Sequence, residues 1–448
     1  MKRDLDLLKG AILPVLIRFA APFMFTAFIQ MIYQLTDIFW IGRLSDQAVA
    51  SVGIVGFLLW IGESIAFIAR TGMGVELAKN VGASNEKEAS KIVAAGVKLS
   101  ILLALVYCLL VELFLEDFVS FYDLEEVVSK GAMDYGRIAL LGLACNMVNF
   151  TFAQIYQSHG NSDTPFRISA LGLLFNMILD PLFIFVFSWG LKGAAWATVL
   201  AQFGVTLIFL YSFHQNQLLG NKQAYYCKMD LDLSWKIFRL GLPVSLLSIV
   251  YASVSVILNK MMALFGSLGV AVFSIGSQIE SISWMSAEGF AGAITAMLAQ
   301  NIGANDQKRA DKIFWVSLKS TFLLGILTGA ILLVFRSPLF SIFLPKSKEG
   351  IILGARYLFI FSFSQPFATL EAGAGACFHG YGQTVIPSAI SISLNLFRIP
   401  LSYLLMQTYG LFGIWIAMSL ISIFRGTSAF LVLLVYKKRA IDKKEVLS

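Results

Sequence analysis

Two aspartates lie inside apolar segments of the chain, where burying a carboxylate is energetically unfavourable. Asp37 stands near the end of the first long apolar segment, and Asp180 stands near the end of a later one. An aspartate in a membrane-spanning helix costs ~2.5–3.5 kcal/mol, and it usually faces a cavity in which it has a function. Because Arg43 and Asp46 follow closely, Asp37 has an alternative position at the membrane boundary. We favour the buried position, since Asp180 offers it a partner.

A carboxamide accompanies the second aspartate. Asn176 and Asp180 are four residues apart and therefore share one face of a helix. Pro181 follows directly and removes a backbone hydrogen bond at this point. Two carboxyl groups beside a carboxamide can share a proton, or they can coordinate a small cation such as Na⁺ with hard oxygen ligands. The alternative is that Asp180 only fixes the end of its helix.

Other polar side chains of the first half could extend this site into a polar chamber. Each of them alone is typical of a hydrogen bond between helices, which is common in membrane bundles. They are Gln30, Tyr33, Gln34, Tyr135, Asn146, Asn149, Gln154 and Thr198.

The second half also carries acids well inside apolar segments. Glu280 and Glu371 could each bind a cationic substrate or a second ion. Alternatively, each could form a structural ion pair with Arg398 or Lys260. Pro22, inside the first apolar segment, permits a helix bend and is a candidate hinge, although a fixed kink that aids packing is the alternative.

The composition shows which elements must position these residues. Of 448 residues, 58% are hydrophobic and 14% are charged, whereas soluble domains have about 25% charged residues. Many apolar runs reach the roughly 20 residues that cross a bilayer. The sequence therefore predicts an all-α polytopic membrane protein with twelve spanning helices, at 11–39, 47–72, 88–114, 130–157, 165–188, 191–213, 235–264, 269–297, 310–335, 350–378, 384–407 and 411–436.

The basic loop residues predict the orientation. Lysines and arginines gather at both ends of the chain, in alternate loops and in the longer polar connection 214–234, all on one side of a twelve-helix count. The positive-inside rule places this side in the cytoplasm. We therefore expect a cell-membrane protein with both termini cytoplasmic. The net charge of +7 then reflects these loops, and a nucleic-acid partner is not expected.

The two halves of the sequence repeat. Residues 77–92 match residues 298–313, and the same offset of 221 pairs Pro22 with Pro243. This repeat predicts an N-terminal six-helix lobe at 1–213, a cytoplasmic linker at 214–234 and a C-terminal six-helix lobe at 235–448. Parallel repeats of this kind are typical of transporters that move two lobes around a central site. With this offset Asp37 falls opposite Leu258. Farther along, Asn176 pairs with Asn395, an offset of 219, and Asp180 then falls opposite Ile399, so the acid pair is unique to the first half.

Signatures of other functions are absent from the sequence. There is no Gly-x-x-x-x-Gly-Lys-Ser/Thr motif for ATP and no nucleophile elbow, so we expect neither an ATPase nor another enzyme. The cysteines and histidines are scattered without metal-ligand spacing. We expect no cofactor and no bound metal, apart from H⁺ or Na⁺ as the coupling ion.

At these residues the sequence resembles the multidrug and toxic compound extrusion (MATE) family, most closely its branch of DNA-damage-inducible protein F (DinF). The resemblance covers essentially the whole chain, and Pro22, Asp37 and the run from Asn176 to Pro181 are its most specific parts. It implies an antiporter that expels organic cations and other amphipathic drugs in exchange for H⁺ or Na⁺. It also implies a cation-coupling site at the positions Asp37, Asn176, Asp180, Tyr135, Gln30 and Thr198, with a bend of the first helix at Pro22.

One departure from the family bears on the coupling ion. The branch known for Na⁺ binding in the C-terminal lobe has an aspartate where this chain has Ala368, and Glu371 lies one turn away. This difference favours H⁺ over Na⁺ and coupling through the N-terminal lobe. The alternative function is a lipid-linked oligosaccharide flippase of the same superfamily, for which only Lys260 and Arg398 offer cationic residues. We expect a monomer in the lipid bilayer.

Overall fold

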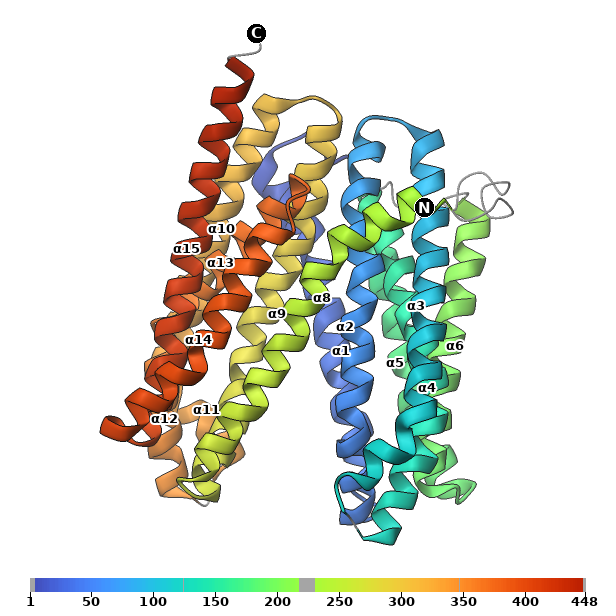
Figure 1. Ribbon diagram of the computed structural model, residues 1–448, viewed down its shortest axis with the longest axis vertical. Helices are drawn as coiled ribbons and strands as arrows, with labels where there is room; N and C mark the ends of the chain where they lie inside the picture. Colours follow the sequence, from blue (N-terminus) through green and yellow to red (C-terminus); the bar gives the residue numbers. More distant parts are fainter. Residues whose placement is uncertain (1–4, 124, 217–229, 346, 446–448) are drawn as a thin grey trace. The chain divides into compact units, whose positions relative to one another are not determined.

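The structure, a computed structural model, describes residues 5–123, 125–216, 230–345 and 347–445, and in these ranges it consists of helices joined by turns and short loops (Figure 1). Most of the predicted linker, residues 217–229, therefore lies outside the described residues. The helices are α1 (Ile12–Ile41), α2 (Asp46–Gly82), α3 (Glu86–Ser120), α4 (Glu126–Ser158), α5 (Asp163–Pro181), the π-helix η1 (Leu182–Val186), α6 (Gly190–Asn216), α8 (Leu231–Ala263), α9 (Ser267–Gly303), α10 (Gln307–Val334), α11 (Arg336–Phe343), α12 (Lys348–Ser362), α13 (Gln365–Gly380), α14 (Val385–Tyr409) and α15 (Leu411–Glu445).

The helix lengths fit a membrane. Ten described helices are long and apolar enough to cross one, and α12 with α13, which meet at a bend of 46°, make an eleventh span. The twelfth predicted span corresponds to α9, which has 37 residues but contains many serines and glycines and two glutamates. The prediction of an all-helical polytopic membrane protein is confirmed.

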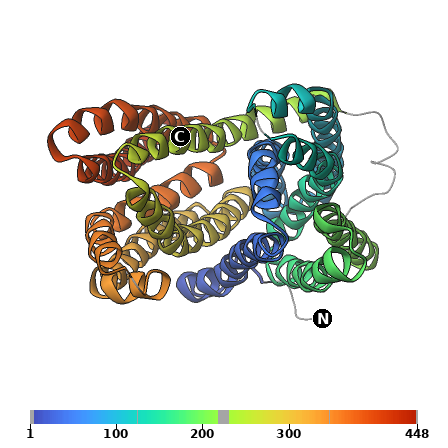
Figure 2. The ribbon, with the colours of Figure 1, turned by 90° about the horizontal axis from the view of Figure 1, so that it is seen from below.

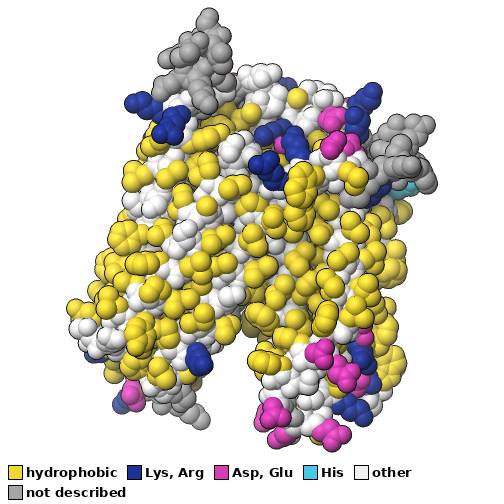
Figure 3. All heavy atoms as spheres, in the orientation of Figure 1, with side chains coloured by type: hydrophobic (Ala, Val, Ile, Leu, Met, Phe, Trp, Pro, Cys, Tyr) yellow, Lys and Arg dark blue, Asp and Glu magenta, His cyan; other side chains and the backbone are white. Residues whose placement is uncertain are grey.

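The surface agrees with this assignment. On the face shown in Figure 3, hydrophobic side chains cover the middle of the helices, and most acidic and basic side chains lie toward the helix ends. On α3, for example, Leu105, Leu109 and Leu113 are 61%, 62% and 64% exposed. Their spacing of four residues makes one apolar stripe along the helix. Such a stripe is stable in contact with lipid and would be unfavourable in water.

The sequence repeat is visible in the turns that start α3 and α10. Ser84 and Asn305 both have positive φ angles, at 54° and 58°. The next residue caps the helix in each case: Asn85 accepts a hydrogen bond from the Glu88 amide, and Asp306 accepts one from the Arg309 amide. These turns satisfy backbone donors that the first turn of a helix leaves free. Equivalent positions in the two halves therefore have the same local geometry.

The chain forms two compact units. The first consists mainly of Phe25–Ser245, and the second of Lys9–Met24, Leu246–Ile302 and the chain from Asp306 onward. The helices α1 and α8 each contribute one segment to each unit. The divisions, after Met24 and after Ser245, are 221 residues apart and so occupy equivalent positions of the repeat. The predicted boundary at the linker stays a prediction.

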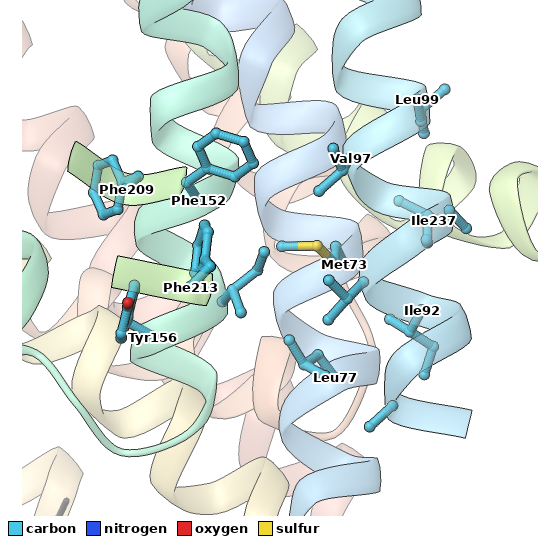
Figure 4. Close-up of a cluster of buried hydrophobic side chains, with 14 of the residues drawn as sticks. Met73, Leu77, Ile92, Val97, Leu99, Phe152, Tyr156, Phe209, Phe213 and Ile237 are labelled. Carbon is cyan, nitrogen blue, oxygen red and sulfur yellow. The ribbon is translucent and has the colours of Figure 1, made fainter. Parts of the chain in front are cut away.

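The core of the first unit joins five helices of the first half, α2 to α6, to the start of α8. Met73 and Leu77 of α2 contact apolar side chains from α3, α4 and α6, and the buried Ile237 of α8 belongs to the same cluster (Figure 4). The rings of Tyr156 and Phe213 stack with their centroids 5.0 Å apart. This cluster fixes α4 and α6, which carry several of the predicted site residues.

The second unit has a comparable core. Trp415 of α15 is fully buried, and its ring centroid lies 5.1 Å from that of Tyr357 of α12. Leu258 of α8 belongs to this cluster and Ile399 of α14 packs against it. In Figure 2, which looks along most of the helices, the blue to green helices and the yellow to red helices are each seen as a bundle. Leu258 and Ile399, the counterparts of Asp37 and Asp180, are thus apolar core residues.

Glycines of α2 and α9 allow close packing against the segments of α8 and α1 that each unit takes from the other half of the sequence. A Cβ atom on Gly72 of α2 would overlap the backbone carbonyl of Ile237 in α8, and one on Gly241 would overlap the carbonyl of Ile68. In the second unit, a Cβ on Gly289 of α9 would lie 2.8 Å from the Met24 backbone nitrogen of α1. Small residues at such positions let helix backbones approach each other in membranes.

Candidate functional site

The end of α5 has an irregular backbone. Pro181, the last residue of α5, has no amide hydrogen, and the chain continues as the π-helix η1. Single π turns occur frequently at functional sites because they change the direction of a side chain relative to the helix. Asp180 immediately precedes this irregularity and is only 1% exposed. Asn176, one turn earlier, is completely buried.

The structure brings the two aspartates together. The carboxyl group of Asp37 on α1 lies within hydrogen-bonding reach of that of Asp180 on α5. Asn176 Nδ2 donates to Asp180 Oδ1 at 3.2 Å. Three buried oxygens, Asp37 Oδ1, Asp180 Oδ2 and Asn176 Oδ1, have no hydrogen-bond donor among the described residues. Two facing carboxyl groups that each keep one oxygen without a donor can be stabilised by one shared proton or by a small cation, since like charges this close repel.

Three hydroxyl groups surround the aspartate pair. Thr198 Oγ1 of α6 donates to Asp37 Oδ2 at 3.5 Å, the upper limit for a hydrogen bond. The Tyr33 hydroxyl is directed toward Thr198 and Gln202, close to both aspartates. Tyr135 of α4, 5% exposed, also lies close enough to interact with both carboxyl groups. Helices α1, α4, α5 and α6 therefore all contribute to this polar site within the first unit.

Other predicted residues of the first half are placed elsewhere. Gln30 and Gln34 are exposed, and within the described chain neither is shown to bond to the aspartate pair. Asn149 Nδ2 instead donates to the Gln202 backbone oxygen at 3.0 Å, and its Oδ1 accepts from Thr206 at 2.9 Å. Asn149 thus links α4 to α6. The proposed roles of these residues stay predictions, as does the hinge role of Pro22, which lies inside a continuous α1.

We expect Thr198→Val to slow gradient-driven transport by less than about tenfold. One hydrogen bond contributes about 1 kcal/mol net, and a tenfold change corresponds to about 1.4 kcal/mol. Initial rates of dye efflux from everted membrane vesicles measure the effect, and Thr198→Ser, which keeps the hydroxyl, should retain the wild-type rate. Complete loss of transport in Thr198→Val would contradict this auxiliary role.

The predicted acids of the second half lie in a separate group within the second unit. Ser391 Oγ donates to Glu371 Oε1 at 2.6 Å, and Arg425 Nη2 lies 3.4 Å from Glu371 Oε2. Glu280 interacts with the side chains of Tyr357 and Gln365. Glu371 thus has an ion-pair partner, but the closest arginine is Arg425 and not the predicted Arg398 or Lys260.

Sequence reasoning missed two charged residues inside helices. Arg425 lies far from either end of α15 and is 5% exposed. Glu63 lies at the middle of α2, where its Oε1 accepts from Asn146 Nδ2 at 3.0 Å. Both were detectable, since each is a charged residue within an apolar run.

The comparisons with known proteins agree with this arrangement. A family model described as MatE matches residues 22–182 and 243–404. The chain belongs to the MATE family. The two matched regions begin 221 residues apart, which is the offset of the sequence repeat, and the first contains Asp37, Asn176 and Asp180.

Relatives of this MATE protein have names that refer to multidrug resistance or to transport. It is 26% identical over 442 residues to the "Probable multidrug resistance protein NorM" of Thermotoga maritima, covering 96% of this chain and 94% of that protein. It is 24% identical to the "FAD transporter" of Shewanella oneidensis, over 77% of each chain. A solved structure described as the outward-facing conformation of a multidrug resistance MATE family transporter superposes with a TM-score of 0.89 at 21% identity, covering 97% of this chain and 98% of that one. The fold is thus that of MATE transporters.

Proposed function

We propose that this MATE protein is an antiporter that exports small amphipathic compounds, organic cations among them, in exchange for protons. The aspartate pair in the first unit carries the proposal. Its facing carboxyl groups each keep one buried oxygen without a donor, an arrangement that one proton can stabilise. Relatives named as multidrug resistance proteins support drugs as cargo.

Protonation of the pair provides the coupling. Asp37 lies on α1, a helix that contributes to both units, whereas Asp180 lies on α5 in the first unit. A shared proton holds α1 against α5, and loss of the proton leaves two like charges that repel. A proton can therefore change the position of α1, with Pro22 as the point at which the helix bends. Sodium is the second candidate ion, because the same oxygens are hard ligands.

The oligomeric state and the orientation in the membrane are also part of the proposal. The protein acts as a monomer in the cell membrane. The distribution of basic residues favours an orientation with both termini in the cytoplasm. It needs no bound cofactor and catalyses no covalent step. Membership of the DinF-like branch also remains part of this proposal.

Everted vesicles that contain the full-length protein test the coupling. We expect uptake of a fluorescent organic cation such as ethidium when the vesicle interior is acidified, and its collapse when a protonophore is added. An imposed Na⁺ gradient without a proton gradient should support little uptake. Vesicles without the protein provide the background. Uptake that follows the Na⁺ gradient alone would reject proton coupling, and no uptake under either gradient would reject the proposed antiport.

A further inference from the structure

Two arginines lie side by side inside the second unit. Arg398 is on α14 and Arg425 is on α15, two helices that pack against each other (Figure 1). Their Nη2 atoms lie 3.4 Å and 3.5 Å from the same Ser422 hydroxyl oxygen. We call these two residues the arginine pair. Because both guanidinium groups reach one hydroxyl, a single oxyanion at this point can contact both of them.

Several donors of the arginine pair have no acceptor. Arg425 Nε and Nη1 and Arg398 Nε are buried and unpaired among the described residues. Arg425 is 5% exposed, and its guanidinium carbon lies 4.9 Å from the centre of the Tyr251 ring, which supports its position. Buried charged donors without acceptors are costly, so these N–H groups are suited to an additional anionic partner. Arg398 is half-buried.

The surrounding acids occupy only part of this donor set. Glu371 pairs with Arg425 through one nitrogen, Nη2. Glu280 interacts with Tyr357 and Gln365 and lies near Arg398, and its Oε1 has no hydrogen-bond donor among the described residues. Glu288, on the same helix as Glu280, is exposed and lies near Glu371. Glu371 is thus the internal anion that competes most directly for Arg425.

The arginine pair is also specific to the second half. With the offsets that pair Asn176 with Asn395 and Gly190 with Gly410, Arg398 and Arg425 fall opposite Leu179 and Val205. Val205 is an apolar core residue of the first unit. The duplicated scaffold therefore does not need an arginine at either position. One half carries a pair of acids, and the other half carries a pair of bases.

We propose that the arginine pair binds an acidic group of the cargo, a carboxylate or a phosphate. Glu371 neutralises Arg425 when no cargo is bound. This inference rests on the proposed transport function and extends its substrate class from cations to amphipathic compounds that bear an acidic group. The planar guanidinium group of arginine can donate two parallel hydrogen bonds to two oxygens of one carboxylate or phosphate, whereas the ammonium group of lysine cannot.

Equilibrium binding to the purified full-length protein tests the site without any gradient. The probes are 1-naphthyl phosphate, 1-naphthoate and 1-naphthylmethylammonium, which share one ring system and differ in the charged group. Isothermal titration calorimetry gives the affinities for the wild type and for Arg425→Gln, Arg398→Gln and Glu371→Gln. Arg356→Gln is the matched control, since Arg356 is an exposed arginine of α12 in the same unit.

We expect at least one of the two acids to bind the wild type and Arg356→Gln equally. Arg425→Gln and Arg398→Gln should each weaken that binding by about tenfold or more, whereas binding of the ammonium probe should not change. Glu371→Gln should strengthen acid binding several-fold, because the competing carboxylate is removed. Preference for the phosphate probe would indicate a phosphorylated cargo, and preference for naphthoate would indicate a carboxylic acid.

Two results would overturn the proposal: no binding of either acid by the wild type or by Glu371→Gln, or wild-type acid affinity in both arginine variants. If the two arginine-to-glutamine variants Arg425→Gln and Arg398→Gln do not fold, Arg425→Lys keeps the charge and should still weaken acid binding, and the gain in Glu371→Gln remains decisive. Failure of antiport in vesicles would leave these affinities unchanged. The two proposals can therefore fail independently.

Discussion

Asp37→Asn is expected to reduce proton-driven efflux on the order of a hundredfold, the upper range for a coupling free energy of ~1–3 kcal/mol. Asparagine has nearly the same shape as aspartate but neither gains nor loses a proton. Its amide can donate permanently to Asp180, so the variant resembles the protonated pair at every pH. Cargo binding should be retained, because the exchange step alone is blocked.

The same vesicle assay, combined with cargo binding to the purified protein, measures this effect. Asp134→Asn is the matched control, because Asp134 pairs with Lys192 at 3.1 Å and both side chains are substantially exposed. Exposed ion pairs contribute little, so this control should transport at the wild-type rate. Full gradient-driven transport by Asp37→Asn would refute coupling through the aspartate pair.

Gly72→Leu is expected to lower transport at least tenfold and to reduce the thermal stability of the protein by several degrees. The backbone of α8 lies directly against this buried glycine, because an added Cβ would overlap the carbonyl of Ile237. Overpacking a core costs ~1–3 kcal/mol even when flexible side chains can adjust, and a backbone carbonyl adjusts less. The substitution therefore separates the first segment of α8 from α2.

Gly53→Leu on the same helix provides the comparison. No heavy atom would lie within 4 Å of a Cβ at Gly53, and the residue is exposed. This variant should keep wild-type transport and unfold at the wild-type temperature, measured by thermal unfolding of the purified protein in detergent. Equal behaviour of the two leucine variants would show that close packing of α2 against α8 is not required.

Much of the fold was predictable because its signals are local and strong. Apolar runs of about 20 residues predict spanning helices directly. The match between 77–92 and 298–313 predicted duplicated turns, and Ser84 and Asn305 indeed share the same unusual backbone conformation. The division of α1 and α8 between the units was not predicted, because helix periodicity describes which face is apolar but not which partner covers it.

The candidate site was predictable only in part. The cost of an aspartate in a membrane indicated Asp37 and Asp180, and their side chains do meet. Gln30 and Gln34 lie on the same helix as Asp37 yet are exposed. A sequence cannot show how α1 is rotated about its axis, so it cannot tell which neighbours of Asp37 accompany it. Arg425 was detectable as a charged residue within an apolar run, but the sequence could not show that Glu371 and Tyr251 are its neighbours, because they lie on other helices.

The division of α1 and α8 also limits how the protein can be assembled. Each helix crosses from one unit to the other two or three residues after a proline, Pro22 or Pro243. Cutting the polypeptide at its midpoint would therefore not release two self-sufficient domains, because each fragment would lack a helical segment that the other fragment supplies. Biogenesis must accordingly wait for the second half of the chain before the first half is complete.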